Sequence, residues 1–162
     1  MVAIRKIQTD IVDRFELTEL KTFRNADGLI YAIVAHNKQM GLVSDSWFGA
    51  YGPIGNFKAV LETMAAAIEH DGYTLWLADL RYLSQSFFEA EAYLTDDVVP
   101  RILAGGLQRE AVVTAELDSL PEGYDVFGSA NQALQRIADG RIRGFTDIGI
   151  ARRWLLAGEL PG

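Results

Sequence analysis

The sequence predicts an α/β fold in which helices cover a mixed sheet of antiparallel and parallel strands. Two observations support this fold class. Three strand-like segments within residues 15–48 follow one another with turn residues and no helical segment between them, as in an antiparallel meander. From residue 42 to residue 115, strand-like and helix-like segments then alternate, which is typical of parallel strands joined by crossover helices.

The first three strands are predicted over residues 15–20, 29–35 and 39–48. The first segment begins with alternating apolar and polar residues, as in a half-buried strand. A cluster of Asn, Asp and Gly precedes the second segment, which is a continuous apolar run. These segments should pair as the meander.

The clearest helix is predicted from Ile54 to His70, where apolar residues recur at helical spacing. Asp71 and Gly72 should end it. The next segment, Tyr73 to Leu80, is short, apolar and rich in aromatic residues, which favours a strand buried on both faces. We expect this strand to be central in the sheet.

Two more helices and a strand are predicted before residue 116. Ser86 and Glu89 have the spacing of a capping box, which opens the first helix. Asp97 and Pro100 fit the opening of a second, shorter helix that a glycine pair would end. Residues 111–115 should form a buried strand.

The C-terminal part is predicted to hold a helix, a strand and a last helix. Ser129 could cap the first of these helices, which would end at Gly140. The strand is expected over residues 141–145. Thr146 is the predicted cap of the last helix, which carries an apolar stripe.

Composition predicts one domain over residues 1–162, with 49% hydrophobic and 23% charged residues and a mean hydropathy of +0.07. The absence of cysteine excludes disulfides, thiolate metal sites and cysteine nucleophiles. We expect no membrane span, because no apolar run approaches the roughly 20 residues that a spanning helix needs. The N-terminus lacks a signal-peptide pattern, so a cytoplasmic protein is expected.

A net charge of -7 and a pI near 4.8 argue against nucleic acid and anionic membranes as partners. Five arginines nevertheless gather in the C-terminal part of the chain. We interpret them as a solvated surface, with anion binding as the alternative. They are Arg136, Arg141, Arg143, Arg152 and Arg153.

Several short patterns carry a resemblance to a known family. They are a Trp-x-Gly strand end, a strand that closes in Asp-Leu-Arg, a proline before a small helix followed by Gly and an Ala-Val strand, and a closing Phe-x-Asp helix with Ala and Trp-Leu. The matching residues are Trp47, Gly49, Trp76, Leu77, Asp79, Leu80, Arg81, Pro100, Gly106, Ala111, Val112, Val113, Phe145, Asp147, Ala151, Trp154 and Leu155.

With these patterns, the chain resembles the STAS/SEC14 group of SpoIIAA-like bacterial domains between about residues 15 and 156. The resemblance implies a SpoIIAA-like (STAS-like) fold. It also implies a role in protein interaction or small-ligand sensing, with no established catalysis.

The resemblance also points to a phosphorylation segment. In regulatory STAS proteins, an Asp-Ser-Ser/Thr-Gly segment opens the helix after the central strand, and a partner kinase phosphorylates its serine. Residues 83–87 correspond to it and contain Ser84 and Ser86, but they lack the aspartate and the glycine. Capping of the following helix is the alternative interpretation of Ser86.

Asp79, Arg81 and Tyr82 are the predicted ligand-binding residues. Asp79 and Arg81 share one face near the end of the central strand, and open α/β sheets bind ligands at the carboxyl ends of their strands. The alternative is a structural ion pair that orients the loop after the strand.

The glycines between residues 49 and 55 match neither the dinucleotide-binding pattern nor the P-loop, so we interpret them as a structural turn. Trp47, Phe48 and Tyr51 adjoin this turn. They are expected at the edge of the core, with an interaction patch as the alternative.

No metal site, cofactor or catalytic residue is predicted. His36 and His70 are the only histidines, which excludes a histidine-rich metal site. The carboxylates within residues 89–97 fit a solvated helix face followed by a cap.

The predicted function is a non-enzymatic regulatory or protein-interaction module, for which a homodimer is a fair expectation. The alternative is a small-molecule or lipid sensor with a pocket near Asp79 and Arg81. An enzyme that uses Asp79 as general acid or base is the third and least favoured hypothesis.

Overall fold

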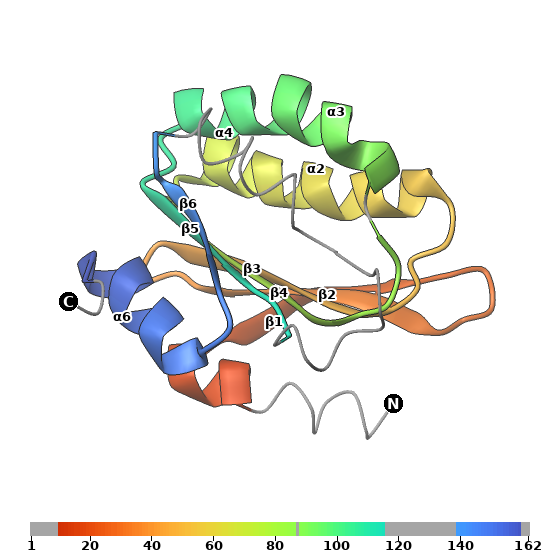
Figure 1. Cartoon of the computed structure of the whole chain (residues 1–162), viewed down its shortest axis with the longest axis horizontal. Coiled ribbons are helices and arrows are strands. Elements are labelled where there is room, and N and C mark those ends of the chain that lie inside the picture. Colours follow the sequence, from red (N-terminus) through yellow and green to blue (C-terminus); the bar gives the residue numbers. More distant parts are fainter. Residues whose placement is uncertain (1–9, 87, 116–138, 160–162) are drawn as a thin grey trace.

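A computed structural model describes residues 10–86, 88–115 and 139–159 and contains a six-stranded sheet in the order β1-β2-β3-β4-β5-β6 (Figure 1). The strands are β1 (Thr18–Arg24), β2 (Ile30–Asn37), β3 (Leu42–Gly49), β4 (Leu75–Leu83), β5 (Arg109–Val113) and β6 (Ile142–Phe145). The helices include α2 (Ile54–Asp71), α3 (Glu91–Tyr93), α4 (Val99–Ala104) and α6 (Ile148–Ala157).

The sheet is mixed, as predicted. Strands β1, β2 and β3 pair antiparallel, whereas β3, β4, β5 and β6 pair parallel. Strand β4 has neighbours on both sides, and its residues from Leu75 to Leu80 are buried. The predicted meander and the central position of this strand are therefore confirmed.

Helices cover both faces of the sheet (Figure 1). One face packs against α2 and the helical segment of residues 88–104, which bury one apolar cluster with the sheet. The other face packs against α6 and a helical turn of residues 10–15, which belong to a second cluster. The side chains of the sheet alternate between these two layers.

Helix α2 begins at Ile54 as predicted and ends at Asp71, one residue beyond the predicted end at His70. It ends because Gly72 adopts a left-handed backbone conformation with φ of 81°, which glycine tolerates without a steric penalty. The Gly72 amide donates a hydrogen bond to the Ala67 carbonyl. Arg101 of α4 clamps α2 through hydrogen bonds to Glu62 and Glu69.

The first strand begins later than predicted. Residues 10–15 form a helical turn, and β1 starts at Thr18. Phe15 and Leu17 are both buried, but they reach the core from the turn and from the connection after it. Two apolar positions with one polar residue between them fit either conformation, and packing against the sheet selects the turn.

Residues 88–104 form one continuous helical segment, where two helices were predicted. A 3-10 turn (Phe88–Ala90) leads into α3, and a π-helical turn (Leu94–Val98) joins α3 to α4. Pro100 lacks an amide donor, and the wider turn before it accommodates this loss without ending the helix.

The cap of α6 is Asp147, and the prediction of Thr146 was wrong by one position. The Asp147 carboxylate accepts a 2.9 Å hydrogen bond from the Ile150 amide. Both residue types are good caps, so the position of the first helical residue decides between them.

The predicted helix from Ser129 to Gly140 falls largely on residues outside the described ranges, as does Arg136. Within the described part of the chain, every helix is too short or too polar to cross a membrane.

Candidate functional site

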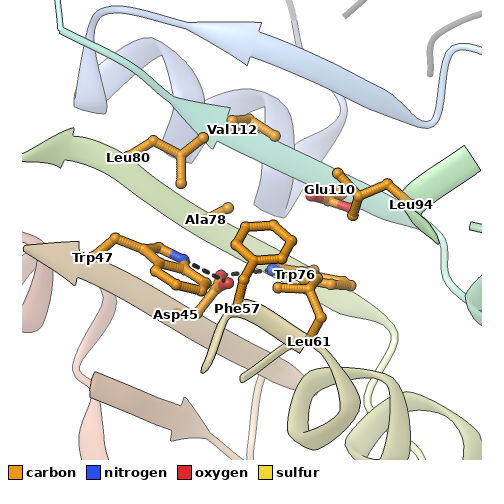
Figure 2. Close-up of a pocket in the computed structure, with 10 residues that line it drawn as sticks. All are labelled: Asp45, Trp47, Phe57, Leu61, Trp76, Ala78, Leu80, Leu94, Glu110 and Val112. Atoms are coloured by element: carbon orange, nitrogen blue, oxygen red, sulfur yellow. Dashed lines mark hydrogen bonds between the residues drawn. The ribbon is translucent and has the colours of Figure 1, made fainter. Parts of the chain in front are cut away.

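A cavity of about 50 Å³ lies between α2 and the three central strands β3, β4 and β5 (Figure 2). Most of its wall is aromatic or aliphatic, and two carboxylic acids are the ionisable groups among the described residues that line it. The lining residues are Asp45, Trp47, Phe57, Leu61, Trp76, Ala78, Leu80, Leu94, Glu110 and Val112. A volume of this size has room for a few water molecules.

Asp45 lies in the middle of β3 and is 2% exposed. Its carboxylate accepts hydrogen bonds from two indole nitrogens, at 2.9 Å from Trp47 and 2.7 Å from Trp76 (Figure 2). Burial raises the pKa of Asp45 to about 6, while the two indole donors act in the opposite direction. The carboxylate is thus mainly ionised at neutral pH and is held in place by both indoles.

Glu110 enters the same cavity from β5, where it is paired in register with Trp76 of β4. It is 9% exposed, and no group in the described part of the chain hydrogen-bonds to its carboxyl. Burial raises its pKa well above the ordinary value, and the nearby charge of Asp45 raises it further. Burial therefore favours the protonated, uncharged form of the Glu110 carboxyl.

The strand pattern explains why these side chains converge. Alternate residues of a strand share a face, so Asp45 and Trp47 of β3 point to the same layer as Trp76 and Ala78 of β4. Ala78 fills little of the space beside the two indoles. The cavity therefore lies above the smallest side chain at this level of the sheet.

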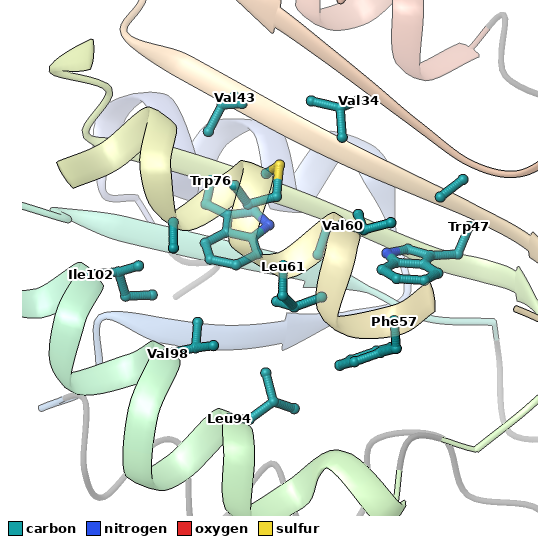
Figure 3. Packing of buried hydrophobic residues seen from close by; sticks show 14 of the residues in the cluster. Val34, Val43, Trp47, Phe57, Val60, Leu61, Trp76, Leu94, Val98 and Ile102 are labelled. Carbon is teal, nitrogen blue, oxygen red and sulfur yellow. The ribbon is translucent and has the colours of Figure 1, made fainter. Parts of the chain in front are cut away.

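The covering helices close the cavity. Phe57 of α2 stacks on Trp47 with ring centroids 5.1 Å apart. Figure 3 shows Leu61 of α2 and Leu94 and Val98 of the facing helical segment in the same apolar layer. Hydrocarbon side chains therefore form most of the wall around the two carboxyls.

The predicted ligand residues Asp79 and Arg81 lie on the other face of the sheet. Arg81 donates to Asp79 from Nε at 2.9 Å and from Nη2 at 3.0 Å. It also donates to Asp10 from Nη1 at 2.8 Å and from Nη2 at 3.1 Å. All three guanidinium nitrogens are thus engaged within the chain, which is the geometry of the structural ion pair. A ligand role for Asp79 and Arg81 stays a prediction.

The remaining predicted residues follow Arg81. Tyr82 is 38% exposed, and its ring lies parallel to that of Phe48. Ser84 is exposed, and its amide donates to the Gly49 carbonyl. Ser86 is half-buried, and its carbonyl accepts from the Tyr51 hydroxyl at 2.8 Å. These three residues do not line the cavity, and phosphorylation of either serine stays a prediction.

The loop after β3 is a structural turn. The Gln85 side chain exchanges two hydrogen bonds with the backbone of Gly52, at 2.9 and 3.0 Å. Trp47, Phe48 and Tyr51 are 1%, 7% and 2% exposed, so these aromatic residues belong to the core and not to a surface patch.

The described arginines of the C-terminal cluster do not converge. Arg141 bonds to the Leu107 carbonyl and to Asp139, Arg143 lies over the Trp154 ring, and Arg152 bonds to the Arg14 carbonyl. In the same described ranges, no group of three or more His, Asp or Glu side chains is arranged to hold a metal ion.

Asp45 and Glu110 were not among the residues predicted to form a site. Asp45 did carry a signal, because it is a lone acid in the apolar, predicted strand 39–48 and has Val43 and Trp47 at period-two positions. A buried strand rarely holds an unpaired acid without a reason. Glu110 immediately precedes the strand predicted from residue 111, so the sequence did not mark it as buried.

No family model matches the chain, and no curated protein matches it. Among solved structures, the chain is similar to an uncharacterised protein from the DUF3478 family with a SpoIIAA-like fold, from Shewanella loihica PV-4. The two are 18% identical, with 86% of this chain and 93% of that chain covered and a TM-score of 0.42. This neighbour has the fold type that the sequence resemblance named, and a likeness at this level says nothing about function.

Proposed function

We propose that this domain is a non-enzymatic regulatory module that responds to a small molecule bound in the cavity between Asp45 and Glu110. The carboxyl of Glu110 carries the proposal, because it is buried, faces the cavity and lacks a hydrogen-bond partner in the described chain. A buried polar group without a partner costs free energy that a ligand can recover by supplying the partner.

The form of the cavity supports ligand binding. Small-molecule sites are typically enclosed, mostly apolar and equipped with a few polar groups that fix orientation. Here aromatic and aliphatic walls enclose two acids. The volume of about 50 Å³ suits a ligand or ligand fragment of a few non-hydrogen atoms.

The choice of groups in the cavity favours binding over catalysis. Among the described residues that line it, none carries a hydroxyl, amine, imidazole or thiol that would act as a nucleophile. Both acids are flanked by hydrocarbon, and one is tied to two indoles.

A regulatory role follows from where the ligand would lie. It would contact the sheet on one side and Phe57 and Leu94 of the covering helices on the other. Occupancy would therefore change how firmly the helical layer packs on the sheet, which is the layer through which a protein partner would sense the ligand.

A cavity-filling variant tests the proposal. A panel of amines, alcohols and carboxylic acids of three to six non-hydrogen atoms is screened by thermal shift against the wild type and Ala78→Val. Valine adds two methyl groups inside the cavity, so compounds that stabilise the wild type should no longer stabilise the variant. Ala92→Val, at an exposed position of α3, is the matched control and should keep the response. Stabilisation that persists in Ala78→Val, or a panel without any effect, would contradict the proposal.

A further inference from the structure

We infer that the cavity selects a ligand with a positively charged nitrogen, such as a small alkylammonium group, held between Asp45 and Glu110. This inference rests on the proposed function and specifies the chemical class of its ligand. Two acids face one cavity, and the second of them is unpartnered within the described chain. A cationic donor satisfies both.

The lysine and the arginine of the covering helices are already engaged elsewhere. The Lys58 ammonium lies over the Tyr93 ring, 5.1 Å from its centroid. Arg101 is bound by three acids, Glu62, Glu69 and Asp97. Neither basic residue lines the cavity. The negative charge of the site is thus not neutralised by either of them.

The aromatic wall favours an organic cation. Trp47 and Trp76 direct their indole N–H groups to Asp45, so the ring surfaces remain for contact with a ligand. Aromatic faces attract ammonium and guanidinium groups, and tryptophan does so most strongly. The alkyl part of such a ligand would pack on the aliphatic wall.

Other ligand classes fit less well. Calcium takes six to eight oxygen ligands and magnesium needs an octahedral set, whereas the cavity offers two carboxyl groups in a hydrocarbon wall. An anion would be repelled by Asp45. A neutral molecule would leave the ionised carboxylate of Asp45 without a counter-charge.

A cation should also change the protonation of the site. It stabilises the ionised form of Glu110, so binding releases a proton when that acid is protonated in the free protein. Asp45 is the only other ionisable group among the described residues that line the cavity. Affinity for a cation should therefore rise with pH.

Three probes of nearly equal size provide the test: n-propylammonium, 1-propanol and propionate. The readout is the set of three indole N–H signals in a 15N-1H spectrum, because the chain has three tryptophans. Trp47 and Trp76 lie in the cavity, whereas Trp154 packs on the opposite face and serves as an internal control. Glu110→Gln removes the charge at constant shape, and Glu89→Gln is the exposed control.

We expect n-propylammonium to shift the Trp47 and Trp76 signals and to bind at least about tenfold more tightly than 1-propanol, since charged hydrogen bonds are the stronger ones. Glu110→Gln should reduce this preference by about tenfold, and Glu89→Gln should leave it unchanged. In the wild type, the affinity should fall as the pH is lowered from 8 to 5. The pH series uses the wild type alone, so its result does not depend on whether Glu110→Gln folds.

The outcomes separate the two claims. Equal or tighter binding of 1-propanol or propionate at the same two indoles would overturn the cation inference and leave the proposed function standing. If none of the probes shifts Trp47 or Trp76, both are overturned. A preference for n-propylammonium that is independent of both Glu110 and pH also overturns the inference.

Discussion

The indole nitrogen of Trp76 donates a 2.7 Å hydrogen bond to Asp45 across the parallel pair of β3 and β4. With the 2.9 Å bond from Trp47, it holds an ionisable acid inside the apolar layer beneath α2. The two hydrogen bonds reduce the free-energy cost of burying the charged carboxylate. They do not remove this cost, since the pKa of Asp45 is still raised to about 6. The stability of the protein should therefore depend on pH, and a substitution of Asp45 measures the part of this dependence that comes from its carboxyl.

The first prediction concerns Asp45→Asn. The pKa of Asp45 is about 6 in the folded protein and 3.8 ordinarily, so between these values the folded state binds more protons than the unfolded state. The contribution of Asp45 to the free energy of unfolding is therefore greatest below about pH 4, declines as the pH rises to about 6 and is constant above that. Asp45→Asn should remove this decline, which amounts to about 3 kcal/mol. Urea denaturation between pH 4 and pH 8 measures the difference.

The control for this prediction is Asp96→Asn, which changes an exposed acid of the same type. Its stability should follow the wild type at every pH. Parallel curves for the wild type and Asp45→Asn would show that the buried carboxylate does not titrate in the predicted range.

The second prediction concerns Trp76→Phe. Loss of the indole donor removes a hydrogen bond that lowers the pKa of Asp45, so that pKa should rise further. The ionised carboxylate then becomes harder to accommodate. We expect a loss of roughly 2–4 kcal/mol at pH 8 and a smaller loss at pH 4. Trp154→Phe makes the same change in size on the opposite face and should cost a similar amount at both pH values.

The third prediction compares the two acids that bind Arg81. Asp79 has a side chain that is 1% exposed, whereas that of Asp10 is 43% exposed. Asp79→Asn should cost about 3 kcal/mol, because it leaves a largely buried guanidinium poorly paired. Asp10→Asn should cost under about 1 kcal/mol, as is usual for an exposed pair. Equal losses in chemical denaturation would show that burial does not govern this ion pair.

The fourth prediction tests the cap of α6. Asp147→Ala should destabilise the domain by about 1 kcal/mol, because it leaves the Ile150 amide without its acceptor. Asp147→Ser should retain most of the stability, and Thr146→Ala should have little effect. Thermal denaturation of the three variants distinguishes them, and a larger loss for Thr146→Ala would restore the cap predicted from sequence.

Local pattern explains which parts of the fold were predictable. The helical spacing from Ile54 to His70 and the compact apolar run from Tyr73 to Leu80 are each satisfied by one element, so the helix was predicted to within one residue and the strand with its bounds two to three residues too early. The start of β1 and the π-helical turn before Pro100 were not predicted. Short segments fit more than one conformation, and packing decides between these conformations.

The candidate site was less predictable than the fold. Asp79 and Arg81 are two residues apart on one strand, so their proximity follows from strand geometry, but Asp10 joins them from 71 residues away. Asp45 and Glu110 lie on different strands, and neither had a signal that named the other as a neighbour.

By itself, the sequence determined the strand and helix periods, the mixed sheet and the absence of thiol chemistry, because each depends on residue type and local spacing. Only the tertiary structure decided which face of the sheet each acid occupies and what covers it. The register of β3, β4 and β5 under α2 brings two acids into one largely apolar cavity, and their altered pKa values arise mainly from that burial. Burial is a property of the assembled layers, and no local stretch of the chain specifies it.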